Sequence, residues 1–131
     1  MGLIYLDSCL LIYAIENHPV YGAGILKTLA REKPERFASS PLTSLECLVQ
    51  PIRLGDVVLQ SRYLGALAQL EELPLTTPVF LQAAQLRARF NLKTPDSLHL
   101  ACAQFHGCAA LWTNDERLAA AGRGLVRNVL R

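Results

Sequence analysis

Charged side chains are scarce in this sequence of 131 residues, which has 13 Lys and Arg against 11 Asp and Glu. They make up 18% of the residues, whereas hydrophobic residues make up 51%. Low charge with high apolar content excludes a disordered chain and allows a large core without cross-links. Because the length is that of one ordinary domain, we expect residues 1–131 to form a single domain. The net charge of +2 is too small to indicate nucleic-acid binding by itself.

Long apolar runs and paired cysteines are also missing. The uncharged stretch from Ser97 to Asn114 is interrupted by polar residues, so no segment predicts a membrane span. The N-terminus lacks a basic segment and has Asp7 within its apolar run, so we predict no signal peptide. The four cysteines form no C-x-x-C pair and no zinc-binding spacing with histidine. We therefore expect buried reduced thiols, a cytoplasmic location and no contact with a membrane.

Short apolar strands alternate with helical segments along the whole chain. Proline and glycine residues mark the ends of the helical segments. The alternation predicts an α/β fold with three layers, a mainly parallel sheet between two layers of helices. Functional residues of such folds collect beyond the carboxyl ends of the strands. The expected strands are Leu3–Leu6, Arg36–Ser40, Leu73–Thr77, Ala110–Thr113 and Leu125–Leu130.

Four acidic residues occupy positions that this fold brings to one edge of the sheet. Asp7 and Asp115 come just after expected strands, whereas Glu46 and Asp96 lie near the starts of helices. Asp7 has a structural alternative as a helix cap, and Asp96 and Asp115 gain about 0.3–1 kcal/mol from a helix dipole. Glu46 borders an apolar helix face with no basic residue at helical spacing. Its carboxylate therefore needs a partner from elsewhere, either a metal ion or a distant arginine.

Carboxylates that converge on one cleft repel each other, which raises their pKa values. A hard dication removes this repulsion and prefers oxygen ligands. Such an ion also lowers the pKa of a bound water and stabilises the leaving oxygen of a phosphodiester. The pattern therefore predicts a metal-dependent site for phosphodiester cleavage, with Asp7, Glu46, Asp96 and Asp115 as metal-binding and catalytic residues.

Other polar residues in these segments are candidates for supporting roles. His99 lies on a helix face near the predicted core, and we interpret it as a core residue rather than a ligand, because the acids already supply oxygen atoms. The neighbours expected to orient ligands or water are Ser8, Ser44, Thr113 and Asn114.

The segments YLDSCLLIY, TSLECL, TPDSLHLACA and LWTNDERL follow one another in this order. Together they resemble the four signature blocks of the PIN-domain nucleases, and most closely those of the VapC-like toxins of bacterial toxin–antitoxin pairs. The resemblance covers nearly the whole chain, although no single block is specific. It matches the four acids of the family to Asp7, Glu46, Asp96 and Asp115, and the polar residue of the last block to Thr113.

The resemblance implies a five-stranded parallel sheet in the order 3-2-1-4-5 between helices. It implies Mg²⁺ or Mn²⁺ as cofactor and endonucleolytic cleavage of single-stranded RNA. It also implies an antitoxin protein as partner and a homodimer, for which Val20–Leu29 and Val57–Leu70 offer apolar faces. Many relatives have an aromatic residue near Leu118, and some have a further acid or amide where this chain has Ala119 and Ala120. This departure leaves open whether the site holds one or two metal ions.

An RNA substrate also needs basic contacts, because the acids repel its phosphates. Lys93 precedes Asp96 and Arg117 follows Asp115, so these two are the best placed in the sequence. Arg53, on the same helix as Glu46, is a third candidate for RNA binding. For each of these residues alone, a solvated surface charge is an equally good interpretation.

Two other classes of protein have to be weighed. The first is a catalytically inactive PIN-like module that binds RNA or protein, which the retention of four acids argues against. The second is an acyl-phosphate phosphatase, whose chemistry needs a second Asp two residues after the first, where this chain has Cys9. A receiver-type phosphoacceptor domain also fails as an interpretation, because this chain lacks the acidic pair that such a domain has before the end of its first strand.

Overall fold

A computed structural model describes residues 2–130 of the chain. The apolar segments pair into one parallel sheet with strand order β3-β2-β1-β4-β5. The order 3-2-1-4-5 and the α/β class are therefore confirmed. The strands are β1 (Ile4–Leu6), β2 (Phe37–Ser39), β3 (Glu71–Glu72), β4 (Ala110–Thr113) and β5 (Val126–Asn128).

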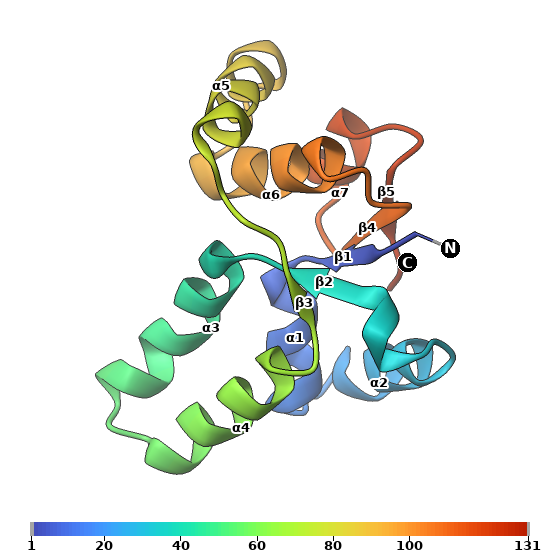
Figure 1. The fold of residues 1–131 in the computed structure, drawn as a ribbon. Coiled ribbons are helices and arrows are strands. Elements are labelled where there is room, and N and C mark those ends of the chain that lie inside the picture. Colours follow the sequence, from blue (N-terminus) through green and yellow to red (C-terminus); the bar gives the residue numbers. More distant parts are fainter. Residues whose placement is uncertain (1, 131) are drawn as a thin grey trace.

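Seven α-helices cover the sheet within the described range (Figure 1). The first four lie on one face and the last three on the other, which gives the predicted three layers. The helices are α1 (Ser8–Ile15), α2 (Gly22–Ala30), α3 (Pro41–Arg53), α4 (Val57–Leu67), α5 (Thr77–Phe90), α6 (Thr94–Phe105) and α7 (Glu116–Ala121).

The central strand β1 is buried on both faces, as expected for a strand inside a parallel sheet. Tyr5 stands between Ala38 of β2 and Leu111 of β4. The backbone N–H of Asp7 still donates to the carbonyl of Trp112 at 3.0 Å. Pairing with β4 therefore continues one residue past β1, and this fixes Asp7 at the carboxyl end of the sheet.

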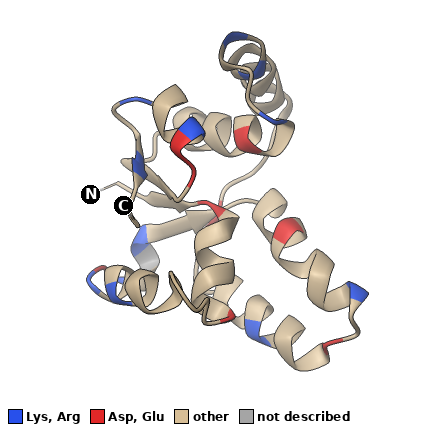
Figure 2. Ribbon diagram, turned by 180° about the vertical axis from the view of Figure 1, so that it is seen from behind, with Lys and Arg blue, Asp and Glu red and all other residues tan. Residues whose placement is uncertain are grey.

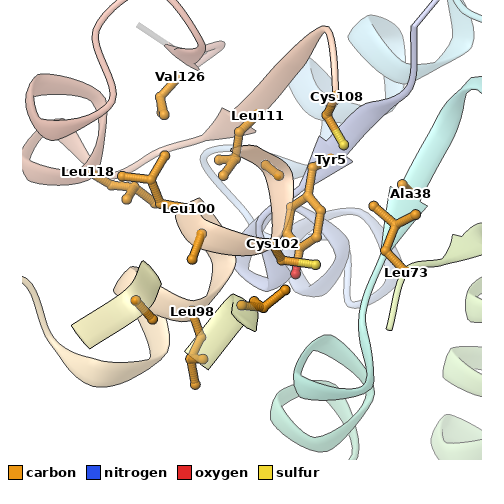
Figure 3. Packing of buried hydrophobic residues seen from close by; sticks show 14 of the residues in the cluster. Tyr5, Ala38, Leu73, Leu98, Leu100, Cys102, Cys108, Leu111, Leu118 and Val126 are labelled. Carbon is orange, nitrogen blue, oxygen red and sulfur yellow. The ribbon is translucent and has the colours of Figure 1, made fainter. Parts of the chain in front are cut away.

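Each face of the sheet has its own hydrophobic core. On the side of α5, α6 and α7, Tyr5 packs with Leu100, Leu111 and Leu118, all of which are fully buried (Figure 3). On the side of α1, α2 and α4, the core is built around residues such as Leu10, which is also fully buried. A buried leucine contributes roughly 1.5–3 kcal/mol relative to an exposed one, so both helix layers are firmly held to the sheet.

Helices α3 and α4 form a hairpin that projects beyond the sheet (Figure 1). Gly55 lies between them with a φ of 67°, a left-handed conformation that glycine adopts without strain. The hairpin carries large apolar side chains that remain in contact with solvent. These are Leu45, Val49, Ile52, Leu54, Val57, Val58 and Leu64.

The prediction of a strand at Leu73–Thr77 is wrong, because β3 lies just before it and Thr77 already belongs to α5. The N–H of Leu73 donates to the carbonyl of Ser39 at 2.8 Å, which is the last bond of the β2–β3 pairing. Pro74 follows and has no N–H to continue the ladder. Among residues 2–130, every helix is too short or too polar to span a bilayer.

Candidate metal centre

The four predicted acids line one cleft of about 730 Å³ at the carboxyl end of the sheet. They come from four places in the chain: the end of β1, helix α3, the first turn of α6 and the loop after β4. Figure 2 shows acidic positions in red on α3, on α6 and at the start of α7. Of the predicted supporting residues, Ser8 and Asn114 also line the cleft, whereas Ser44 does not.

Asp7 forms the floor of the cleft and is only 7% exposed. Its Oδ2 accepts a hydrogen bond of 2.6 Å from the hydroxyl of Thr113, and that hydroxyl accepts 3.0 Å from the N–H of Asp115. Asp7 has the extended backbone of a helix cap, but its carboxylate makes no capping bond to α1. The capping role is therefore not the reason for an acid here, and Thr113 holds Asp7 from behind the cleft.

Asp115, in contrast, does cap a helix. Its Oδ1 accepts from the N–H groups of Arg117 at 2.9 Å and Leu118 at 3.3 Å, in the first turn of α7. Both of these bonds use the same oxygen. The cap and a role in the cleft are compatible, because no described residue makes a hydrogen bond to Oδ2 of Asp115.

Glu46 has a partner that the sequence did not reveal. Its Oε1 lies 2.6 Å from Nε2 of His99, a residue that is only 1% exposed, and accepts 2.7 Å from the hydroxyl of Ser8. Burial favours a raised pKa for Glu46, but the hydrogen bond and electrostatic interaction with His99 and the hydrogen bond from Ser8 outweigh it and lower the pKa. His99 lies one helical turn after Asp96, and this spacing was the available signal that both face the cleft side of α6.

Asp96 has the opposite surroundings. Among the described residues, no hydrogen-bond donor reaches its half-buried carboxylate. Burial raises the pKa of Asp96, and the negative charges of Asp115 and Asp7 raise it further. Asp96 is therefore held among like charges, the electrostatic situation that a bound cation relieves.

The donor chemistry of the cleft suits a hard dication. Within residues 2–130, no three acidic, histidine or cysteine side chains are already arranged to hold one ion, and Asp7, Glu46 and Asp115 each have hydrogen-bond partners in the protein. Burial, then the charge of Asp7, raise the pKa of the Cys9 thiol in the cleft wall to about 12, so it is no thiolate ligand at neutral pH. Carboxylate oxygens completed by water are the coordination that Mg²⁺ prefers.

The predicted RNA-binding residues lie outside the lining of the cleft. Lys93 and Arg117 are exposed beside Asp96 and Asp115, at the starts of α6 and α7. Arg53 is exposed at the far end of α3, where its guanidinium contacts Gln50 at 3.4 Å. Lys93 and Arg117 are thus nearer to the rim than Arg53 is.

Solved structures share the fold over nearly the whole chain. A toxin–antitoxin complex from Klebsiella pneumoniae is 23% identical with a TM-score of 0.80, covering 96% of this chain and 97% of that chain. DNA-bound VapBC from Salmonella typhimurium is 21% identical with a TM-score of 0.74, covering 98% and 99%. VapC20 of Mycobacterium tuberculosis, a sarcin-ricin loop cleaving toxin, is 16% identical with a TM-score of 0.73, covering 91% and 95%.

These identities are too low to show more than a common fold. A search of curated proteins finds no significant match. The family model of the PIN domain matches residues 4–124, a range that contains all four acids of the cleft. Since the match spans nearly the entire chain, the protein belongs to the PIN domain family.

Proposed function

We propose that this protein is a Mg²⁺- or Mn²⁺-dependent endoribonuclease that cleaves single-stranded RNA. The observation that supports the proposal best is the gathering of Asp7, Glu46, Asp96 and Asp115 in one cleft. These acids come from separate elements, and burial, followed by the negative charges of Asp115 and Asp7, raises the pKa of Asp96. A protein without use for a cation gains nothing from keeping such a site together.

The residues of the cleft have different roles in the proposed reaction, according to their positions. A bound dication supplies an activated water and stabilises charge on the leaving oxygen of the phosphodiester. Asp7, Glu46, Asp96 and Asp115 hold the ion, and Thr113 keeps Asp7 oriented through its 2.6 Å bond.

Polar neighbours supply the remaining contacts. The amide nitrogen of Asn114 is directed to the Tyr13 hydroxyl at 3.4 Å, so its carbonyl oxygen is available for the ion or a water. Ser8 is bound to Glu46 in the cleft, whereas Ser44 lies outside the lining of the cleft and is proposed only as a more distant contributor. Lys93, Arg117 and, farther away, Arg53 supply attraction for RNA phosphates.

We further propose that the protein is the toxin of a toxin–antitoxin pair, with an antitoxin as partner and a homodimer as its own assembly. The solved structures with this fold include toxin–antitoxin complexes. The exposed apolar side chains of the α3–α4 hairpin support a protein partner, because such a patch is costly in water. The four cysteines are free thiols, which suits the reducing cytoplasm. Light scattering that gives a monomer mass at micromolar concentration would contradict the homodimer.

The decisive experiment compares wild type with Asp7→Asn on a labelled single-stranded RNA. Wild type is expected to cut within the strand in Mg²⁺ or Mn²⁺, to stop in chelator and to recover when metal is returned. Asp7→Asn keeps an acceptor for Thr113 and removes one of the mutually repelling carboxylates, so without metal it should be as stable as wild type or more stable. Its cleavage should fall by roughly 100-fold or more, and its stabilisation by Mn²⁺ should shrink.

Three outcomes of that experiment contradict the proposal or redirect it. Cleavage that persists in chelator excludes the metal-dependent reaction. An Asp7→Asn variant with full activity and a full metal-induced shift removes Asp7 from the site. RNA binding without cleavage, in any metal, favours the inactive binding module instead.

A further inference from the structure

A chain of buried polar side chains runs from the core to the cleft. Its first bond joins the hydroxyl groups of Ser40 and Tyr5 at 2.8 Å. Its second joins the Tyr5 hydroxyl to Nδ1 of His99 at 2.6 Å, and its third joins Nε2 of His99 to Oε1 of Glu46 at 2.6 Å. Ser40 and Tyr5 are fully buried and His99 nearly so. The chain thus connects β1, the start of α3 and α6 behind one wall of the cleft.

The hydrogens of this chain can be assigned one by one. An ionised Glu46 has only acceptor atoms, so Nε2 of His99 carries the hydrogen between them. A neutral imidazole then has a bare Nδ1, which accepts from the Tyr5 hydroxyl. Burial raises the pKa of Tyr5 far above its ordinary range, so this phenol keeps its proton. Ser40 donates to the Tyr5 oxygen, and every member of the chain is satisfied.

The same chain selects one oxygen of Glu46. Both Ser8 and His99 bind Oε1, and no described residue makes a hydrogen bond to Oε2. Because Glu46 lines the cleft, the free oxygen is the one available to a ligand there. A glutamate side chain otherwise samples several rotamers, and fixing it at the moment of binding costs entropy.

We propose that His99, held in one tautomer by Tyr5, is a positioning residue that fixes Glu46 with Oε1 inward and Oε2 presented to a divalent cation in the cleft. This inference rests on the proposed function, since it concerns the same metal centre. Residues that orient metal ligands from behind typically contribute 10–100-fold to metal affinity or activity, by order of magnitude. A loss of roughly this size is expected when the chain is broken at His99.

The first test measures Mn²⁺ affinity by titration calorimetry in wild type, His99→Leu and His99→Gln. Leucine fills the site without a donor, whereas the amide of glutamine still reaches toward Glu46. We expect affinity to fall by roughly 10–100-fold in His99→Leu and to recover in part in His99→Gln. Leu98→Ala is the matched control: it destabilises the same helix from a buried position without touching the chain. An equal loss of affinity in Leu98→Ala would assign the effect to stability and overturn the inference.

The second test asks whether His99 acts through Glu46. In a double-mutant cycle, His99→Leu should cost Mn²⁺ affinity in wild type and little more in Glu46→Gln. Equal costs in both backgrounds would overturn the inference. Wild type that fails to bind Mn²⁺ would reject the proposed function as well, whereas normal binding by both wild type and His99→Leu would reject the positioning role alone.

The third test needs no metal. Nitrogen NMR of labelled histidine in the metal-free protein should show His99 with its hydrogen on Nε2 and a bare Nδ1 at neutral pH. Tyr5→Phe removes the donor to Nδ1, so the Nδ1 signal should move and Mn²⁺ affinity should fall in the same direction as in His99→Leu. A wild-type ring with a hydrogen on Nδ1 would contradict the tautomer lock.

Discussion

Glu46 and Asp96 face the same cleft, yet the protein treats their carboxylates in opposite ways. Glu46, on α3, receives Ser8 and His99, and its pKa is lowered despite burial. Asp96, on α6, is half-buried and lies near other negative charges, and both conditions raise its pKa. One side of the cleft is therefore satisfied by the protein itself, whereas the other is left in a state that a cation improves.

This difference assigns two different tasks to the two sides of the proposed metal site. The Glu46 side uses protein contacts for orientation, because a carboxylate held in one rotamer loses less entropy when it binds. The Asp96 side keeps unrelieved repulsion, which makes the empty cleft less stable and metal binding more favourable. We therefore expect substitutions of Glu46 and Asp96 to lower RNA cleavage alike and to change the stability of the metal-free protein in opposite directions.

The largest expected effect is on cleavage, where the two sides should behave alike. Glu46→Gln and Asp96→Asn each remove one proposed negative ligand of a hard dication, so cleavage of single-stranded RNA should fall by roughly 100-fold or more in both. The measurement is single-turnover cleavage at saturating Mn²⁺. Glu72→Gln, at an exposed acid on β3, is the control and should cleave like wild type. Full activity in either cleft variant would remove that acid from the site.

The next effect is on stability without metal, where the two sides should differ in sign. In chelator, Asp96→Asn relieves repulsion at a half-buried group, so its melting temperature should rise by a few degrees. Glu46→Gln replaces charge-assisted hydrogen bonds from Ser8 and His99 with neutral ones, a loss on the order of 1 kcal/mol. Calorimetry checks both, and shifts of the same sign would contradict the comparison.

A smaller effect is the pH dependence of that stability. The folded pKa of Asp96 is raised, so its destabilising charge is present at neutral pH and disappears as pH falls through the folded pKa toward the ordinary value of 3.8. The folded pKa of Glu46 is lowered, so its stabilising charge is complete above 4.5 and is lost as pH falls through the folded pKa. Urea unfolding in chelator should therefore show the Asp96→Asn advantage shrinking on acidification, with the Glu46→Gln deficit persisting to lower pH.

The smallest expected effect concerns RNA affinity, and it compares a basic residue near Asp96 with one on the helix of Glu46. Lys93 lies beside Asp96, whereas Arg53 lies at the far end of the helix that carries Glu46. Lys93→Ala should weaken binding of single-stranded RNA severalfold and flatten its salt dependence, whereas Arg53→Ala should change both less. Filter binding across salt concentrations in chelator measures this. A larger effect at Arg53 would move the RNA path onto the α3–α4 hairpin.

The sequence by itself determined most of the architecture and which four acids line one cleft. Apolar strands bounded by proline and glycine are local patterns, and the carboxyl ends of parallel strands necessarily meet at one edge. Asp7 and Asp115 are therefore assigned to that edge by their positions along the chain, and the four segments around the acids indicate the PIN domain family and its strand order. The misplaced third strand had a local cause too, because Pro74 ends the pairing just after Leu73.

Only the tertiary structure decided how each acid is held. Glu46 and His99 are 53 residues apart, and their contact depends on how α3 and α6 pack around β1, which no local pattern encodes. The assembled fold likewise decided that Tyr5, whose ring packs in the core, directs its hydroxyl at His99. A buried polar group must find its partner wherever packing provides one, so the identity of that partner is a property of the assembled fold.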